Sequence, residues 1–396
     1  MKVNSRELLE KIIFLAFIYL NGSLWAVDGI SGIQQFSFKI ILILVVIVAE
    51  KPKFKKKNVQ FTLFLLVMML ITILTAGIYF DLDVAAILNL LFALVIVSSY
   101  SEEVFAYWYC KIMGFLACCS LVGFIMYYVA RGVLNVFPQV VWHAGIRFAN
   151  MIVTLVPLTM EDYFRNWGIF REPGFYSIFL VIALVFELFS KGEPRKTIIY
   201  VEIFSLITTF STTGIVALTL ILAAYILDRK DTYVEKKWKK RLMVAAIGIM
   251  CVVSLWMFFT SEGQGMFARI FGKVWSERST NVSYINRQLG IKRAVSIFEN
   301  NALFGGGYIA VVGGEIDFTE LLWFAIYGVL FGIVCNLYYL IYPLKYGESR
   351  MSKLFLMATF FVIAYSQSIE TSMLTFIILL YSFDSGIYKR RKNTMR

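Results

Sequence analysis

The residues best suited to binding or catalysis form one short charged stretch, Arg165-Asn166-Trp167-Gly168-Ile169-Phe170-Arg171-Glu172-Pro173-Gly174. It carries two arginines and one glutamate, and an almost unbroken apolar run, 175–189, follows it. Arginine is always charged, and its planar fork binds phosphate or carboxylate through paired hydrogen bonds. We therefore interpret this stretch as the mouth of a membrane helix, where arginines meet an anionic ligand.

A second arginine belongs to a predicted amphipathic helix over 284–299. One face of that helix carries Arg287, Ile291, Ala294 and Phe298. A charge on an otherwise apolar stripe is costly without an anionic partner, so Arg287 is a candidate ligand-binding residue. Lys292 and Arg293 lie off the stripe and are predicted to face solvent.

Three glycines follow this helix, in the segment Asn301-Ala302-Leu303-Phe304-Gly305-Gly306-Gly307. Glycine lets backbone N–H groups approach a ligand closely or form a nest around an anion. Gly305 and Gly306 are therefore candidate anion-binding positions, and a plain turn is the simpler alternative.

The composition indicates a polytopic membrane protein, because 59% of the residues are hydrophobic and the mean hydropathy is +0.74. Apolar runs of about 20 residues predict an all-α fold with about twelve transmembrane helices in one integral membrane domain, 1–396. The predicted spans are 8–26, 33–50, 60–80, 83–100, 105–130, 174–190, 196–211, 213–228, 242–260, 318–342, 352–367 and 369–387. A tight hairpin is predicted at 211–214.

The basic residues predict the orientation of these spans. Lysines gather in alternate connections, as at 51–57 and 229–241, which places both termini in the cytoplasm. The net charge of +12 is assigned to this bias and not to nucleic-acid binding. Two long connections, 131–173 and 261–317, are then predicted to lie outside. Their aromatic and apolar content predicts that they have an ordered structure.

The outer connections carry arginine where the inner ones carry lysine. Positive charge outside opposes the orientation rule, so it needs another reason. The functional interpretation is a pyrophosphate site, and its candidate residues are Arg147, Arg165, Arg171 and Arg287. The ordinary alternative is pairing with lipid headgroups or with nearby acids such as Glu161 and Asp162.

Three acidic residues, Glu172, Asp317 and Glu320, are candidates for a general base. Each has an ordinary alternative, because an acid at the start of a helix complements the helix dipole. Pro173 suits a first helical turn. The sequence shows no metal-ligand cluster. His143, the one histidine, is typical of an interfacial residue, and the five cysteines lie in apolar runs that predict core positions without disulfides.

The pattern Arg165…Gly168-Ile169-Phe170…Glu172-Pro173-Gly174 resembles the O-antigen polymerase and O-antigen ligase family, which includes capsular and exopolysaccharide repeat-unit polymerases. The segment from Arg287 to the glycines at 305–307 is similar to the family, as is the hairpin at 211–214. The resemblance covers the topology of the whole chain and these motifs in sequence.

The resemblance implies an inverting glycosyltransferase without metal or cofactor, with a glycosyltransferase C-like fold. Its donor is a growing glycan on undecaprenyl pyrophosphate in the membrane lipid, and its acceptor is a lipid-linked repeat unit at the outer face of the cytoplasmic membrane. Arg165 and Arg287 match the arginines that hold the pyrophosphate. A flippase and a chain-length regulator are the implied protein partners.

Two other functions remain open from the sequence. A ligase-like transferase is disfavoured, because the ligases carry a histidine after the glycines and 315–320 has none. A flippase or other transporter of lipid-linked oligosaccharide would have a similar number of spans. It would be expected to place charges at mid-membrane, where the sequence offers only Glu187, Glu202 and Glu370.

Overall fold

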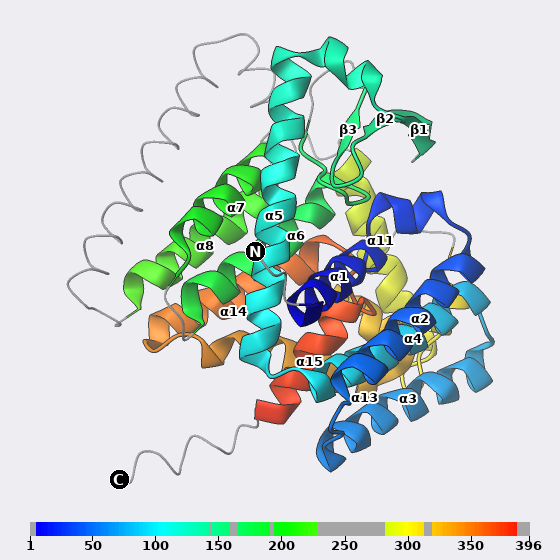
Figure 1. Cartoon of the computed structure of the whole chain (residues 1–396). Coiled ribbons are helices and arrows are strands. Elements are labelled where there is room, and N and C mark those ends of the chain that lie inside the picture. Colours follow the sequence, from blue (N-terminus) through cyan, green and yellow to red (C-terminus); the bar gives the residue numbers. More distant parts are fainter. Residues whose placement is uncertain are drawn as a thin grey trace, which may run out of the picture.

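A computed structural model of the chain describes residues 5–142, 145–158, 165–190, 194–228, 282–312 and 319–385. At Trp142, 282–288, Thr319 and Glu320 it describes the backbone alone. Helices dominate these parts (Figure 1). They are α1 (Ser5–Leu20), α2 (Gly32–Glu50), α3 (Lys56–Ala76), α4 (Phe80–Ser99), α5 (Glu102–Val129), α6 (Pro173–Phe189), α7 (Lys196–Thr208), α8 (Thr212–Leu227), α11 (Val282–Asn300), α12 (Gly307–Val311), α13 (Thr319–Ile341), α14 (Arg350–Ser366) and α15 (Met373–Ser385).

Every predicted span in these parts coincides with a helix, which confirms a mostly helical fold. The predicted span 242–260 lies outside the described residues. Five segments in the described ranges are long and apolar enough to cross a membrane. They are Gly32–Glu50, Lys56–Ala76, Phe80–Ser99, Glu102–Val129 and Leu321–Lys345. Helices α6, α8 and α15 are apolar but shorter, so a total of twelve crossings stays a prediction.

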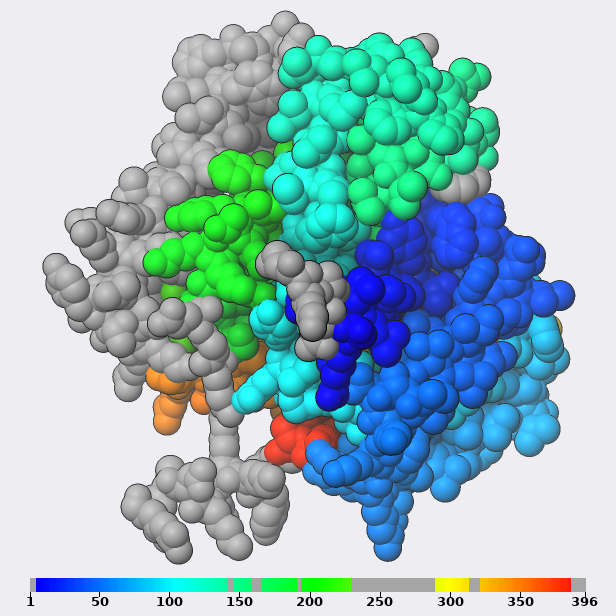
Figure 2. All heavy atoms as spheres, viewed as in Figure 1, coloured from blue at the N-terminus to red at the C-terminus, as the bar shows by residue number. Residues whose placement is uncertain are grey.

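The centre of the bundle is built on α6 and α15, whose side chains are buried on nearly every face. An apolar helix without a polar face is stable both inside a bundle and against lipid, so it is their burial that places these two helices at the centre. Helices α2 and α3 show the opposite pattern, because large apolar side chains such as Val48 and Leu74 are 76% and 84% exposed. Their outward faces suit lipid, and they form one side of the molecule (blue in Figure 2).

The helix termini collect at two ends of the bundle. The lysine end joins the start of α1, the α2–α3 connection, the start of α5 and the ends of α13 and α15. Its contacts include Arg6 with Glu50 (3.0 Å), Lys55 with Asp384 (2.6 Å) and Tyr342 with Glu102 (2.9 Å). The arginine end joins residues 165–172, the α7–α8 turn and the α14–α15 loop. The described residues thus place the lysine-rich α2–α3 connection away from the arginine-rich stretch, and the orientation of the two ends stays a prediction.

The first long connection contains a small sheet that the sequence analysis did not predict. After a 3-10 turn, η2 (Arg131–Val136), the strands β1 (Gln139–Trp142), β2 (Ile146–Asn150) and β3 (Leu155–Pro157) pair antiparallel in the order β1-β2-β3. The sheet lies above the helices in Figure 1. Its core includes Phe148, whose ring packs edge-on against Trp167 at 5.3 Å. The sheet therefore covers the charged stretch.

Close backbone contacts at Gly305 and Gly328 fix the shape of α13. This helix is broken at Gly328, where φ is +82°, and the segment before α12 docks into the break. The amide of Val329 donates to the carbonyl of Ala302 (2.8 Å), and the amide of Gly306 donates to the carbonyl of Ala325 (2.8 Å). A Cβ at Gly305 or Gly328 would overlap the facing backbone. The glycines are thus required for packing.

Gly305→Ala and Gly328→Ala are expected to destabilise the protein, because each adds an overlapping Cβ at a left-handed φ, +74° and +82°. We expect a loss of about 2 kcal/mol or more, measured as a lower thermal unfolding midpoint of the purified protein in detergent. Gly132→Ala is the control, since a Cβ there meets no atom within 4 Å. Equal midpoints for the three variants would contradict this packing.

Candidate functional site

Asn166 anchors the charged stretch inside the bundle. Its side chain is 1% exposed, and its Nδ2 donates to the hydroxyls of Ser120 (3.0 Å), Ser205 (3.3 Å) and Thr208 (2.9 Å). Its Oδ1 accepts from the amide of Gly168 (3.1 Å), which turns the chain back on itself. Buried amides are stable only when satisfied in this way, so the stretch has one register.

The hydroxyls below Asn166 form a closed network between α5, α6 and α7. Ser120, Tyr176 and Ser205 lie 2.9 to 3.0 Å from one another. The ring of Tyr176 also packs under Gly168, which has a φ of +55° and leaves no room for a Cβ without movement of the ring. The stretch and the three helices are thus held as one unit.

Arg165 caps the end of α7. Its Nε donates to the carbonyl of Thr209 (2.9 Å), and Nη2 donates to that of Phe210 (3.2 Å). A cation at a helix C-terminus satisfies orphan carbonyls and complements the dipole. The α7–α8 turn that it holds lies at 209–211, slightly before the predicted hairpin at 211–214, because Ser211 caps α8 by accepting from the amide of Gly214 (3.3 Å). Arg165 therefore has a structural role in this turn.

Arg171 is held differently. Its guanidinium lies over the ring of Phe175 at 4.6 Å, and its Nε is 3.8 Å from Oε1 of Glu172. The Nε is buried and donates no hydrogen bond within the described structure, while the side chain keeps 32% of its surface exposed. Arg171 is thus the arginine of the stretch that retains donors for a ligand.

Glu172 is the N-cap residue of α6, and Pro173 opens the helix as predicted. The Glu172 side chain makes no capping hydrogen bond and is 38% exposed. Its dipole role is therefore electrostatic only. The carboxylate stays accessible beside Arg171, so its predicted role as a base is still a prediction.

A second acid approaches Arg171 from the α14–α15 loop. Glu370 is 8% exposed, and its Oε2 has no hydrogen-bond partner among the described residues. Its backbone carbonyl accepts from Nε1 of Trp323 (2.9 Å). Burial raises the pKa of the Glu370 carboxyl, while its own backbone amide and the Arg171 guanidinium act in the opposite direction. A buried acid beside an arginine is typical of functional sites.

The elements around this loop bring further polar groups to the same place. The hydroxyl of Thr371 bonds that of Tyr308 (2.7 Å), the carbonyl of Thr371 accepts from Nδ2 of Asn89 (2.7 Å), and the amide of Met373 donates to Oδ1 of Asn21 (2.9 Å). We define the Glu370 cluster as Asn21, Asn89, Arg171, Tyr308, Tyr327 and Glu370. It joins α1, α4, α12 and α13 to the charged stretch.

The Glu370 cluster was not predicted from the sequence. Glu370 was expected at mid-membrane, in a span beginning at residue 369, whereas α15 begins at Met373 and Glu370 lies in the loop before it. The available signal was the polar run 367–372 between two apolar spans. That run was too short to stand out from an ordinary turn.

Several predicted site residues lie beyond what the structure describes. Asp317 and His143 fall outside the described residues. Arg287 belongs to α11 and Glu320 to α13, and the structure describes only their backbones. The convergence of Arg165 and Arg287 on one cavity is therefore still a prediction. Arg147 is exposed on β2, opposite Val141.

The backbone amides of the two glycines predicted to bind an anion donate to carbonyls of the protein instead. The amide of Gly305 donates to the carbonyl of Asn301 (2.7 Å), and that of Gly306 donates to Ala325. An anion nest at Gly305 and Gly306 would need N–H groups that the structure already uses. The role visible here is close packing against α13.

The predicted surface of α11 is correct at Lys292, which is exposed, but Arg293 departs from it. Arg293 is half-buried, and its Nη2 donates to the carbonyls of Ala310 and Val312, both at 3.1 Å, at the end of α12. The helix packs through Ala294, which is buried as predicted.

The predicted core positions of the cysteines hold only in part. Cys110 and Cys335 are buried, but Cys118 is exposed on α5, where its apolar neighbours also point outward. Within the described ranges these thiols are free, and no group of three potential metal ligands occurs there.

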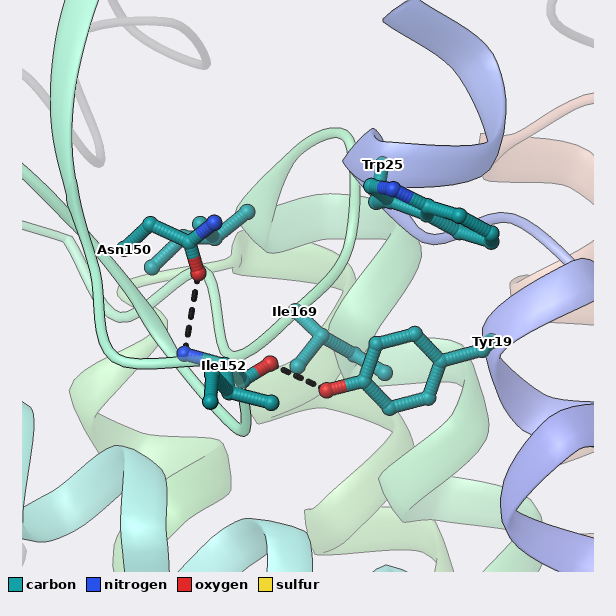
Figure 3. Close-up of a pocket in the computed structure, with 6 residues that line it drawn as sticks. Tyr19, Trp25, Asn150, Ile152 and Ile169 are labelled. Atoms are coloured by element: carbon teal, nitrogen blue, oxygen red, sulfur yellow. Dashed lines mark hydrogen bonds between the residues drawn. The ribbon is translucent and has the colours of Figure 1, made fainter. Parts of the chain in front are cut away.

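A cavity of about 320 Å³ opens beside the charged stretch (Figure 3). Tyr19, Trp25, Asn150, Ile152, Leu155 and Ile169 line it. The Tyr19 hydroxyl donates to the carbonyl of Ile152 across one side of the cavity, which joins α1 to the sheet connection. Its walls are mainly apolar, and Ile169 lies two residues before Arg171 in the chain.

The fold and composition define a helical integral membrane protein, with a polar site at the arginine end. Comparisons of the chain with protein-family models, with curated proteins and with solved structures each find no match. The support for a function therefore comes from the chemistry of the site and from the resemblance of the sequence motifs.

Arg165→Ala is expected to lower stability and Arg171→Ala to leave it nearly unchanged. The first removes two bonds to the α7–α8 turn, worth about 1–3 kcal/mol when carbonyls are left unpaired. The second removes a guanidinium with an unsatisfied Nε. The measurement is the unfolding midpoint of each variant in detergent. An equal fall for both would show that Arg171 is also structural.

Proposed function

We propose that the protein is a polysaccharide repeat-unit polymerase that transfers a growing glycan from undecaprenyl pyrophosphate to a lipid-linked repeat unit at the outer membrane face. The observation that carries the proposal is Arg171, a partly exposed guanidinium with an unused donor at the mouth of α6. A helix N-terminus and a guanidinium together favour an anion such as pyrophosphate. The resemblance of the motifs supports the same ligand.

In this mechanism, the bond between the donor sugar and the pyrophosphate breaks while the acceptor hydroxyl attacks. The pyrophosphate oxygen keeps the electron pair, and Arg171 neutralises the charge that develops there. Arg165 positions the stretch through the α7–α8 turn. Arg287 is proposed as the second pyrophosphate arginine, as the sequence pattern predicts.

The cavity beside Ile169 supports a lipid-linked substrate. Trp25, Ile152 and Leu155 give it apolar walls next to the stretch that carries Arg171. An isoprenoid tail and its pyrophosphate need apolar and cationic surfaces side by side. We assign the first isoprene units of the donor to this cavity.

One observation favours the transporter alternative. Glu202 is fully buried in α7, and both of its carboxylate oxygens lack hydrogen-bond partners in the described structure. An ionisable residue at such depth is commonly a substrate or proton site. Glu187, by contrast, pairs with Arg195 at 2.6 Å near the lysine end, which is a structural arrangement.

Arg171→Ala is expected to abolish long chains while single repeat units persist at the cell surface, because the leaving group loses its counter-charge. We expect polymerisation to fall roughly 100-fold or more. Arg171→Lys should recover little, since an ammonium lacks the bidentate fork. The measurement is the length of surface polysaccharide on a gel, in a deletion strain complemented at matched membrane levels.

Lys292→Ala is the matched control, because Lys292 is an exposed cation on α11. Arg287→Ala in the same strain tests the second arginine. Full-length polysaccharide from Arg171→Ala would reject the role of Arg171. If deletion of the gene removes even single units from the surface, and Glu202→Gln does the same, the transporter alternative replaces the polymerase.

A further inference from the structure

The Glu370 cluster contains several buried polar atoms that have no hydrogen-bond partner among the described residues. They are Nδ2 of Asn21, Oδ1 of Asn89, Nε of Arg171, Oη of Tyr327 and Oε2 of Glu370. Each unsatisfied group costs about 1–3 kcal/mol if nothing binds it. Donors and acceptors both occur in the set, so the cluster suits a ligand that accepts and donates hydrogen bonds.

These atoms belong to one place because their residues are tied to one loop. Asn21 and Asn89 bond backbone groups of Met373 and Thr371. The ring of Tyr327 meets that of Tyr308 edge-on at 6.1 Å, and the Tyr308 hydroxyl bonds Thr371. The same loop lies against the start of α6, where Gly174 faces Gln367 three residues after Arg171 in the chain.

We infer that the Glu370 cluster binds the hydroxyl groups of the acceptor sugar and that Glu370 takes the proton of the attacking hydroxyl. The inference rests on the proposed function and adds an acceptor site to it. Sugar hydroxyls each donate and accept, as the unpaired atoms require. The rings of Tyr308 and Tyr327 are buried and pack edge-on beside these atoms.

The loop presents polar residues at the arginine end. Gln367, Ser368, Thr371 and Ser372 are half-buried and form a polar rim, while Glu370 lies buried between them in the chain. A Cβ at Gly174 would lie 2.9 Å from Nε2 of Gln367, so the rim touches the start of α6. Acceptor hydroxyls at this rim therefore lie beside the stretch that carries Arg171.

The proton step balances without another reagent. The acceptor oxygen forms a bond to the anomeric carbon of the donor sugar as the bond from that carbon to pyrophosphate breaks. The hydroxyl proton passes to the Glu370 carboxylate, and the pyrophosphate leaves with the bonding electrons near Arg171. Glu370 then releases its proton to water, ready for the next transfer.

The first test uses the purified full-length protein with lipid-linked repeat units in liposomes. Glu370→Gln is expected to slow chain growth roughly 100-fold or more while Glu370→Asp retains part of the rate. In the wild type, the rate should fall at acid pH as the base is protonated, and Glu370→Gln should lose this dependence. Glu299→Gln, an exposed acid on α11, is the control.

A second test removes one unpaired atom without changing the shape of the protein. Tyr327→Phe deletes a buried hydroxyl that interacts with the Tyr308 hydroxyl but makes no well-formed hydrogen bond among the described residues, so the unfolding midpoint should change little. The same change should raise the KM for the acceptor about tenfold if the hydroxyl binds sugar. Tyr338→Phe, on α13 against Phe61 and Phe383 at the lysine end, should change neither quantity.

The outcomes separate the two proposals. Chain growth by the wild type, with unchanged growth by Glu370→Gln and an unchanged acceptor KM for Tyr327→Phe, overturns the acceptor site and leaves the polymerase in place. Such a result would mean that the cluster holds only water. No chain growth by the wild type rejects the polymerase, and the acceptor site with it. If Glu370→Gln does not fold, the KM of Tyr327→Phe decides alone.

Discussion

The buried amide of Asn166 is the interaction on which the arrangement of the site depends. In the interior of a helix bundle, a polar side chain without partners is destabilising, so the hydroxyls of Ser120, Ser205 and Thr208 fix one position for it. That position sets the neighbours on both sides along the chain. Arg165 reaches the α7–α8 turn, and Arg171 reaches the mouth of α6. A shift of one residue would break both arrangements.

The two arginines of the stretch have different roles although they are the same type of residue. Arg165 gives its donors to carbonyls at the end of a helix, so its charge stabilises the fold. Arg171 stacks on Phe175, and its buried Nε donates no hydrogen bond among the described residues. Stacking positions a guanidinium without occupying its hydrogen bonds. The division follows from geometry alone, because charge and residue type are the same.

Much of the fold was predictable from the sequence, because apolar runs, Pro173 and the hairpin at 211–214 act locally. The helical character, the start of α6 and the helix over 284–299 follow from such signals. The sheet was not predictable, since β1 to β3 are short and depend on pairing across a loop. Asn166 and Glu370 were also missed, because their partners are distant in sequence. Charge drew attention to Arg165, whereas its bonds to carbonyls appear only in three dimensions.

The break at Gly328 divides α13 into two pieces. The shorter piece carries Trp323, which holds the backbone of Glu370, and the longer piece runs to the lysine end. The segment before α12 is bonded to both pieces, because Ala302 accepts from Val329 and Gly306 donates to Ala325. The position of the Glu370 backbone therefore depends on a segment that is distant from it in the sequence.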